Sequence, residues 1–150
     1  MCIEGKTAII TGSTSGIGLG IARSLANRGA NIVLNSFTNL ESDYNLAENL
    51  AKEFSVKVSS ACADMRNPQE CRDLITSQSA CDILVNNAGI QYVAPIEDFP
   101  TSKWDDIIAV NLSSSLHTTA AALTIMRAGG WGRVINISSA HGLTASPFKS

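Results

Sequence analysis

The segment TGSTSGIG, at residues 11–18, contains glycines at positions 12, 16 and 18. It follows the apolar run KTAII and precedes a stretch in which apolar residues recur at every fourth position. Glycines allow a backbone to approach a ligand closely, and the free amide groups and positive dipole of a helix start favour an anion. The segment therefore predicts a pyrophosphate site, although a glycine-rich turn between a strand and a helix can also exist without a ligand.

Three further polar segments follow apolar runs: CAD at residues 62–64, NNAGIQ at 86–91 and ISSAHG at 137–142. Their carboxylate, amide, hydroxyl and imidazole groups could bind a ligand or move a proton. Each also has a simpler explanation when taken singly. Asp64 and Ser139 could sit at strand ends, Gln91 in a loop and His141 in a capped turn, while Asn111 could bond locally within a helix.

Apolar periodicity predicts that strands and helices alternate along the chain. Gly29 ends the first helix, and Pro68 suits the first turn of the third. The strands are expected at residues 6–12, 31–35, 56–64, 81–89 and 132–139, and the helices at residues 16–29, 40–54, 67–78 and 102–127.

Two of these helices carry more detailed expectations. In the helix over residues 40–54, the apolar side is expected to contain Tyr44, Ala47, Ala51 and Phe54. The helix over residues 102–127 is expected to open with a capping pattern in the letters SKWD, in which the serine and the aspartate bond the first free amides.

The predicted strands are apolar on both faces, as expected for a parallel sheet that helices cover on both sides. The sequence therefore predicts one α/β domain over residues 1–150 with a Rossmann-type, doubly wound parallel sheet. Ligands of such sheets bind beyond the carboxyl ends of the strands. This rule selects the four polar segments described above.

Composition narrows the class of protein. The 150 residues are 45% hydrophobic, carry a net charge of −2 and show no basic stripe, so neither nucleic acid nor a membrane is an expected partner. The four cysteines lack metal-ligand spacing, and we expect reduced thiols and no metal site. The N-terminus shows no signal peptide, so a cytoplasmic location is expected, with a mitochondrial matrix protein as the alternative.

The glycine spacing, NNAG after the fourth strand, Asn111 in the long helix and ISS after the fifth strand occur in the order typical of one family. From residue 6 to the end, the chain resembles the short-chain dehydrogenase/reductase family. The resemblance implies an NAD-binding Rossmann domain and hydride transfer between nicotinamide and an alcohol carbon. It assigns the dinucleotide to Gly12, Ser13, Thr14, Ser15, Gly16, Ile17, Gly18, Phe37, Asp64, Met65, Asn87, Ala88 and Gly89.

Catalytic roles follow from the same resemblance. Ser139 would hydrogen-bond the reacting oxygen, and Asn111 would hold a catalytic water. The family's general acid/base is a tyrosine with a lysine four residues later, but neither Tyr44 nor Tyr92 is followed by such a lysine. We therefore expect the chain to be the N-terminal, five-strand part of the domain, cut before that motif and inactive by itself.

The end of the second strand bears on the choice of cofactor. Family members that bind NAD often place an acid there for the ribose 2′-hydroxyl, and those that bind NADP place Arg or Lys nearby. Residues 35–37, NSF, contain no acid, and neither residues 11–16 nor 35–39 contain Arg or Lys. Because a 2′-phosphate would lack a cation, we expect NAD.

The substrate is expected to be a small hydroxy or keto acid. Gln91, His141 and Lys149 match positions that bind a carboxylate in the branch of the family that oxidises D-3-hydroxybutyrate to acetoacetate. Lysine supplies charge, while glutamine and histidine supply N–H donors. The alternatives are a reductase of 3-oxoacyl or sugar substrates, or a non-catalytic dinucleotide-binding remnant. The family also implies a homotetramer that uses the long helix around residues 104–123.

Overall fold

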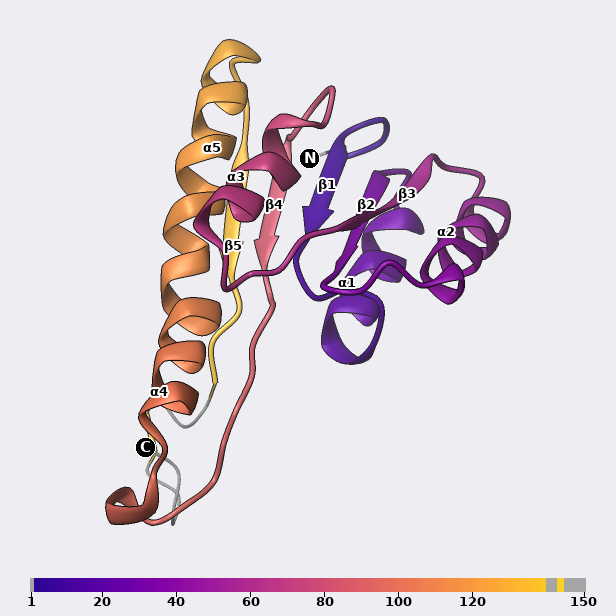
Figure 1. Ribbon diagram of the computed structural model, residues 1–150. Coiled ribbons are helices and arrows are strands. Elements are labelled where there is room, and N and C mark those ends of the chain that lie inside the picture. Colours follow the sequence, from indigo (N-terminus) through magenta and orange to yellow (C-terminus); the bar gives the residue numbers. More distant parts are fainter. Residues whose placement is uncertain (1, 140–142, 145–150) are drawn as a thin grey trace.

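The computed structural model describes residues 2–139 together with 143 and 144. Five parallel strands form one sheet in the order β3-β2-β1-β4-β5, which confirms the predicted doubly wound architecture (Figure 1). The strands are β1 (Thr7–Ile10), β2 (Asn31–Ser36), β3 (Val58–Cys62), β4 (Ile83–Asn86) and β5 (Arg133–Asn136). The chain reverses its direction of travel across the sheet between β1 and β4, and this switch point is where such folds bind ligands.

Helices cover both faces of the sheet (Figure 1). Helices α1 (Gly16–Ala26) and α2 (Glu41–Phe54) pack on one face, and α3 (Pro68–Thr76) and α5 (Ser114–Ala128) pack on the other. Strand β1 is buried because helices cover both faces of the sheet. Its side chains alternate between the faces, so Ala8 and Ile10 point toward α1 and α2 and Ile9 points toward α3 and α5. Each face therefore has its own apolar core.

The helix expected over residues 102–127 is continuous but not uniform. It consists of α4 (Thr101–Ile108), the π-helical segment η2 (Ala109–Ser113) and α5. The expected serine cap is wrong. The helix begins one residue earlier, at Thr101, so Pro100 is the N-cap and no side chain makes a capping hydrogen bond. A short 3-10 turn, η1 (Ile96–Asp98), precedes it in the segment after β4.

Helix α2 buries only part of the predicted side, because Ala47 is buried and Phe54 packs against the same core, but Tyr44 does not. Its buried residues are Asp43, Ala47 and Leu50, whereas Tyr44 is 48% exposed and hydrogen-bonds Asn39. Hydropathy alone places an aspartate outside a core. Here the hydroxyl of Ser36 hydrogen-bonds the Asp43 carboxylate and compensates for its burial.

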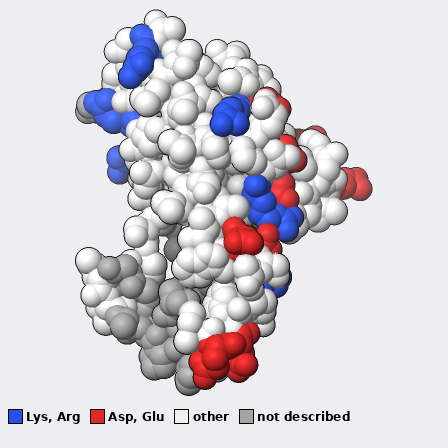
Figure 2. Space-filling model, turned by 60° about the vertical axis from the view of Figure 1, so that its left-hand side comes forward, with Lys and Arg blue, Asp and Glu red and all other residues white. Residues whose placement is uncertain are grey.

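Charges lie in small separate groups on the face shown in Figure 2, without a continuous basic patch. None of the described helices is long and apolar enough to cross a membrane. In the described part of the chain, no three His, Cys, Asp or Glu side chains gather in a way that could hold a metal ion.

The cysteines are all unpaired. Burial raises the pKa of the Cys71 thiol to about 11 and that of Cys81 to about 12. Both thiols are therefore protonated near neutral pH, and they behave as small core side chains rather than as nucleophiles.

Candidate dinucleotide-binding site

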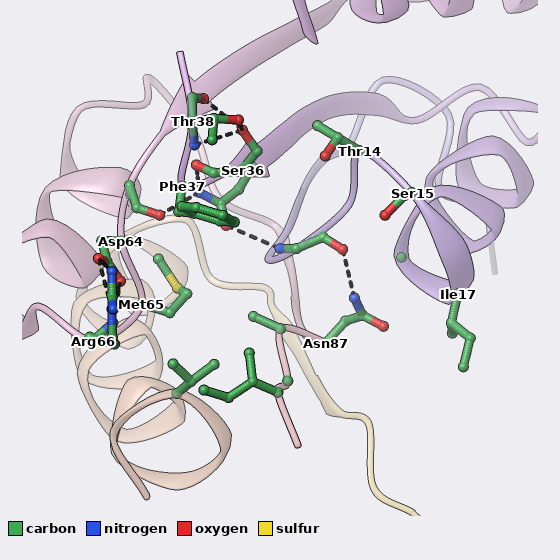
Figure 3. A pocket seen from close by; sticks show the side chains of 18 residues that line it. Thr14, Ser15, Ile17, Ser36, Phe37, Thr38, Asp64, Met65, Arg66 and Asn87 are labelled. Atoms are coloured by element: carbon green, nitrogen blue, oxygen red, sulfur yellow. Dashed lines mark hydrogen bonds and ion pairs between the residues drawn. The ribbon is translucent and has the colours of Figure 1, made fainter. Parts of the chain in front are cut away.

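A cavity of about 560 Å³ lies at the carboxyl ends of β1, β2, β3 and β4. Figure 3 shows Thr14, Ser15 and Ile17 on one side of it, and Ser36, Phe37, Thr38, Asp64, Met65 and Arg66 on the other, with Asn87 between. The described residues that line it are Gly12, Thr14, Ser15, Ile17, Gly18, Asn35, Ser36, Phe37, Thr38, Ala63, Asp64, Met65, Arg66, Asn87, Ala88, Gly89, Ile90 and Val110.

Two glycines shape the turn between β1 and α1. At Gly18 an added Cβ would lie 2.4 Å from the carbonyl oxygen of Gly12 and 2.5 Å from Nδ2 of Asn87, so only glycine lets α1 start against β1. Gly16 has a φ of +55°, and a Cβ there would meet no protein atom within 4 Å. The turn therefore leaves open space at Gly16, as a site for a close-fitting ligand requires.

The first turn of α1 forms one wall of the cavity. Ser15 is the N-cap, its side chain makes no capping hydrogen bond, and the first turn contains no acidic residue. Ile17 is 70% exposed beside it. Because the first amides of a helix lack intrahelical partners and carry partial positive charge, this wall suits an anionic group.

Thr11 connects the glycine turn to the end of β4. Its hydroxyl oxygen accepts hydrogen bonds from the backbone amides of Asn87 (3.0 Å) and Ala88 (2.9 Å). Asn87 in turn donates from Nδ2 to the carbonyl oxygens of Thr11 (2.9 Å) and Gly12 (3.0 Å). These contacts fix the cavity wall that Asn87, Ala88 and Gly89 provide.

Asn35 and Ser13 connect the same turn to β2 and β3. Asn35 accepts from the Gly12 amide (3.1 Å) and donates to the carbonyl oxygens of Ala61 and Ala63 (both 3.2 Å). Ser13 is fully buried, donates to Ile10 and accepts from the Asn35 amide. The side chain of Ser13 therefore holds the backbone, and neither it nor Gly16 lines the cavity.

The far wall combines an ion pair with apolar side chains. The guanidinium of Arg66 donates from Nε to both carboxylate oxygens of Asp64, at 2.9 and 3.0 Å. This side-chain hydrogen bond lowers the pKa of Asp64 below its usual value of 3.8, against a smaller opposing effect of burial. Phe37, 72% exposed, and Met65 add apolar surface next to the pair.

Asn111 lies in the π-helical segment η2 and bonds the chain just after β4. Its Oδ1 accepts from the amide of Ile90 at 2.8 Å, and its Nδ2 donates to the carbonyl oxygen of Ile90 at 2.9 Å. Asn86 ties β4 to its neighbours, because it donates to Asn136 at 2.8 Å and accepts from Thr118 at 2.7 Å. These contacts give Asn86 a structural role.

Two of the residues predicted to act on the substrate, Ser139 and Gln91, are described and do not line this cavity. Ser139 follows β5 at the same sheet edge but does not line the cavity, and Gln91 is exposed in the segment after β4. His141 and Lys149 lie outside the described residues.

Several lining residues were not predicted, among them Asn35, Ser36, Thr38, Arg66 and Val110. Asn35 and Ser36 belong to the strand end that was searched only for charged residues. Arg66 follows the third strand, outside the two segments searched for a cation, but its place directly after the CAD segment could have drawn attention to it.

Residues 6–150 match the family described as short chain dehydrogenase. The chain belongs to this family. Members of the short-chain dehydrogenase family bind a nicotinamide dinucleotide, and the cavity fits one: it is lined by the first turn of α1 and by polar groups at the ends of β2, β3 and β4, and the glycine turn beside it leaves open space at Gly16.

Curated relatives share this part of the sequence. The chain is 56% identical over 149 residues to D-beta-hydroxybutyrate dehydrogenase of Rhizobium meliloti (strain 1021), covering 97% of this chain and 58% of the relative. The Cupriavidus necator protein of the same name is 52% identical, with 99% and 58% covered. The 2-dehydro-3-deoxy-D-gluconate 5-dehydrogenase of Bacillus subtilis is 39% identical over 91% of this chain and 54% of that protein. The chain thus spans somewhat more than half the length of these relatives.

The fold also matches solved structures of the family. L-sorbose reductase from Gluconobacter frateurii, solved in complex with NADPH and L-sorbose, superposes with a TM-score of 0.93 at 30% identity. The match covers 99% of this chain and 59% of the reductase.

Proposed function

We propose that this chain forms the NAD-binding part of a dehydrogenase that moves hydride between nicotinamide and the hydroxyl carbon of a small hydroxy acid. 3-Hydroxybutyrate and acetoacetate are the proposed substrate pair. The observation that carries the proposal is the cavity at the switch point of the sheet, where the open space at Gly16 adjoins the N-terminus of α1. The names of the two relatives at 56% and 52% identity support the substrate.

Within this proposal, the bound nicotinamide supplies the hydride acceptor or donor. Ser15 and the first amides of α1 bind the pyrophosphate, and Asn87, Ala88 and Gly89 line the ribose next to the nicotinamide. Asp64 accepts a hydrogen bond from the adenine amino group. The carboxylate of Asp64 already accepts from the backbone amide, Nε and Nη2 of Arg66, two contacts on each oxygen, so the adenine amino group would take the place of one of these donors.

NAD rather than NADP is the proposed cofactor. Of the described residues that line the cavity, Arg66 alone is a lysine or arginine. Its guanidinium donates hydrogen bonds to both carboxylate oxygens of Asp64. Among the residues that the structure describes, none would therefore offer a free cation to a 2′-phosphate at the end of β2.

On the substrate side, Ser139 is proposed to hydrogen-bond the reacting oxygen, and Gln91, His141 and Lys149 to bind the carboxylate. Asn111 is proposed to position the segment after β4 through Ile90 and to hold a water in the proton path. No Tyr-x-x-x-Lys occurs in these 150 residues. Proton transfer needs a positioned group within hydrogen-bond reach, so we propose that the 150 residues alone bind cofactor without turnover.

A chimera tests the substrate. These 150 residues, joined to the remaining part of the Rhizobium meliloti relative, should reduce acetoacetate with NADH, whereas the 150 residues alone should not. In the chimera, Ser139→Ala should lower kcat by about 10²–10³, the effect of losing one donor to a developing oxyanion. Faster reduction of the neutral ketone butan-2-one than of acetoacetate would contradict the keto-acid assignment.

Assembly is part of the proposal. Large apolar side chains are exposed along the long helix, namely Trp104, Leu112, Leu116 and Leu123. Exposed apolar patches of this kind mark interaction surfaces. We propose that this helix pairs with a second copy in a homotetramer, and a monomeric mass of the chimera in analytical ultracentrifugation would contradict it.

A further inference from the structure

A buried carboxylate lies directly behind the cavity wall at the end of β2. Asp43, in the first turn of α2, is 7% exposed. Its Oδ2 accepts a hydrogen bond from Oγ of Ser36 at 2.7 Å and a longer one from Oγ1 of Thr38 at 3.4 Å. Ser36 and Thr38 both line the cavity (Figure 3), so the carboxylate is hydrogen-bonded to two residues of the cavity wall.

No described cation neutralises this carboxylate. Within the described ranges, no Lys, Arg or His nitrogen lies within 4.0 Å of Asp43, in contrast to Asp64 and Asp82, which form ion pairs. An acid in the first turn stabilises a helix start, which accounts for part of its role. It does not account for burial toward the cavity. A charge removed from water is screened less than a surface charge, so its field extends into the cavity.

This position is where dinucleotide-binding folds distinguish their cofactors. An acid at the end of the second strand binds the ribose 2′-hydroxyl of NAD, and an arginine nearby accepts the 2′-phosphate of NADP. Here residues 35–39 contain neither an acid nor a cation. A charged side chain of the next helix, Asp43, instead contacts this wall through Ser36 and Thr38.

We propose that Asp43 is a specificity-determining positioning residue. It orients the Ser36 and Thr38 hydroxyls that face the ribose, and its negative charge disfavours a cofactor with a 2′-phosphate. This inference rests on the proposed nicotinamide-dinucleotide site. A phosphate monoester carries a charge of about −1.5 to −2 near pH 7, so Asp43 repels it. A ribose hydroxyl is neutral and can hydrogen-bond the hydroxyls of Ser36 and Thr38 while these remain bonded to Asp43.

The test compares NADH and NADPH binding to the 150-residue chain by calorimetry. Asp43→Asn keeps the size of the side chain and an oxygen that accepts from Ser36, but it removes the charge. The ratio of the NADPH to the NADH dissociation constant should fall at least about tenfold, which corresponds to ~1.4 kcal/mol. If Asp43 had a purely structural role, the substitution would weaken the binding of NADH and NADPH equally and leave this ratio unchanged.

Two further variants complete the experiment. Glu41→Gln removes the same charge from the same helical turn, but its side chain is exposed, and the ratio should stay within about twofold of wild type because water screens that charge. Asp43→Ser is measured in parallel because it also lacks the charge, so the inference can be tested even if the asparagine variant folds poorly. It should shift the ratio in the same direction.

The outcomes separate this inference from the proposed function. Wild-type binding of NADH with an unchanged ratio in both Asp43 variants would overturn the role of Asp43 alone. A wild-type chain that binds neither nucleotide would overturn the proposed function and this inference together. A similar fall of the ratio in Glu41→Gln would show that the net charge of the chain, rather than the position of Asp43, sets the preference, and it would also overturn the inference.

Discussion

At the scale of single residues, the side chains around the cavity are of two kinds. Thr11, Ser13 and Asn35 are buried, and their side chains hydrogen-bond the backbone at the ends of the strands. Ser15 and Phe37 are exposed and line the cavity. The Ser15 side chain makes no capping hydrogen bond, and that of Phe37 has no hydrogen-bonding group. The first kind shapes the site and the second is available to a ligand, so substitutions in the two groups should affect different measurements.

Thr11→Val should destabilise the chain. Valine has nearly the same shape as threonine but cannot accept from the amides of Asn87 and Ala88, which would then lose their partner. Leaving such donors unsatisfied costs about 1–3 kcal/mol, measurable by urea unfolding. Thr14→Val, in the same turn, is the control and should change stability by less than about 0.5 kcal/mol. Equal stability of Thr11→Val and wild type would contradict this role.

The Asp64–Arg66 pair should make stability depend on acid pH. Arg66 lowers the pKa of Asp64 in the folded chain below its unfolded value of about 3.9. The pair therefore stabilises fully above that unfolded value, and the contribution is lost as the pH falls through the lower, folded pKa. Arg66→Gln should destabilise more at about pH 6 than at about pH 2.5. Lys103→Gln, an exposed cation elsewhere, should show no such difference between the two pH values.

At the scale of helices and strands, local patterns predicted most of the fold. Runs of apolar residues placed all five strands, and the three glycines placed the turn before α1. The errors arose where a residue's setting depends on a partner elsewhere. Asp43 is buried because Ser36, on the preceding strand, bonds it, and no helical periodicity contains that information. Likewise, the lining role of Arg66 depends on where β3 ends relative to its neighbours.

The π-helical segment η2 is the other feature that periodicity missed. A π-helical turn holds one more residue than an α-helical turn and occurs frequently at functional sites. In this chain it contains Asn111, whose side chain binds the backbone of Ile90 in both directions. The segment thus couples the long helix to the chain that leaves β4.

Asn111→Ala should loosen the segment after β4. It removes the acceptor of the Ile90 amide, so hydrogen exchange at that amide should become at least about tenfold faster, as expected when ~1.4 kcal/mol of protection is lost. Ser113→Ala, also within η2, should leave the rate unchanged. Unchanged protection of Ile90 in Asn111→Ala would contradict the coupling.

At the scale of the whole molecule, the two edges of the sheet differ in character. At the amino edge, Lys6 pairs with Asp82 at 3.0 Å and lies over Trp131 at 4.8 Å, and Arg133 lies over the same ring at 4.9 Å. These contacts join β1, β4 and the approach to β5. At the carboxyl edge the strands end in the cavity instead. The ligand cavity therefore lies at the carboxyl edge, as expected of a doubly wound sheet, and the contacts around Trp131 lie at the opposite edge.

The central claim is that the cavity binds NAD through the glycine turn, and calorimetric titration of NAD into three forms of the 150-residue chain tests it most directly. Wild type should bind. Gly16→Val should show no binding, because the added side chain would fill the open space proposed for the pyrophosphate. Gly20→Ala, a change in α1 where a Cβ likewise meets no atom within 4 Å, should bind like wild type. Circular dichroism establishes that each form is folded. Absence of NAD binding by wild type, or equal affinity in Gly16→Val, would contradict the account.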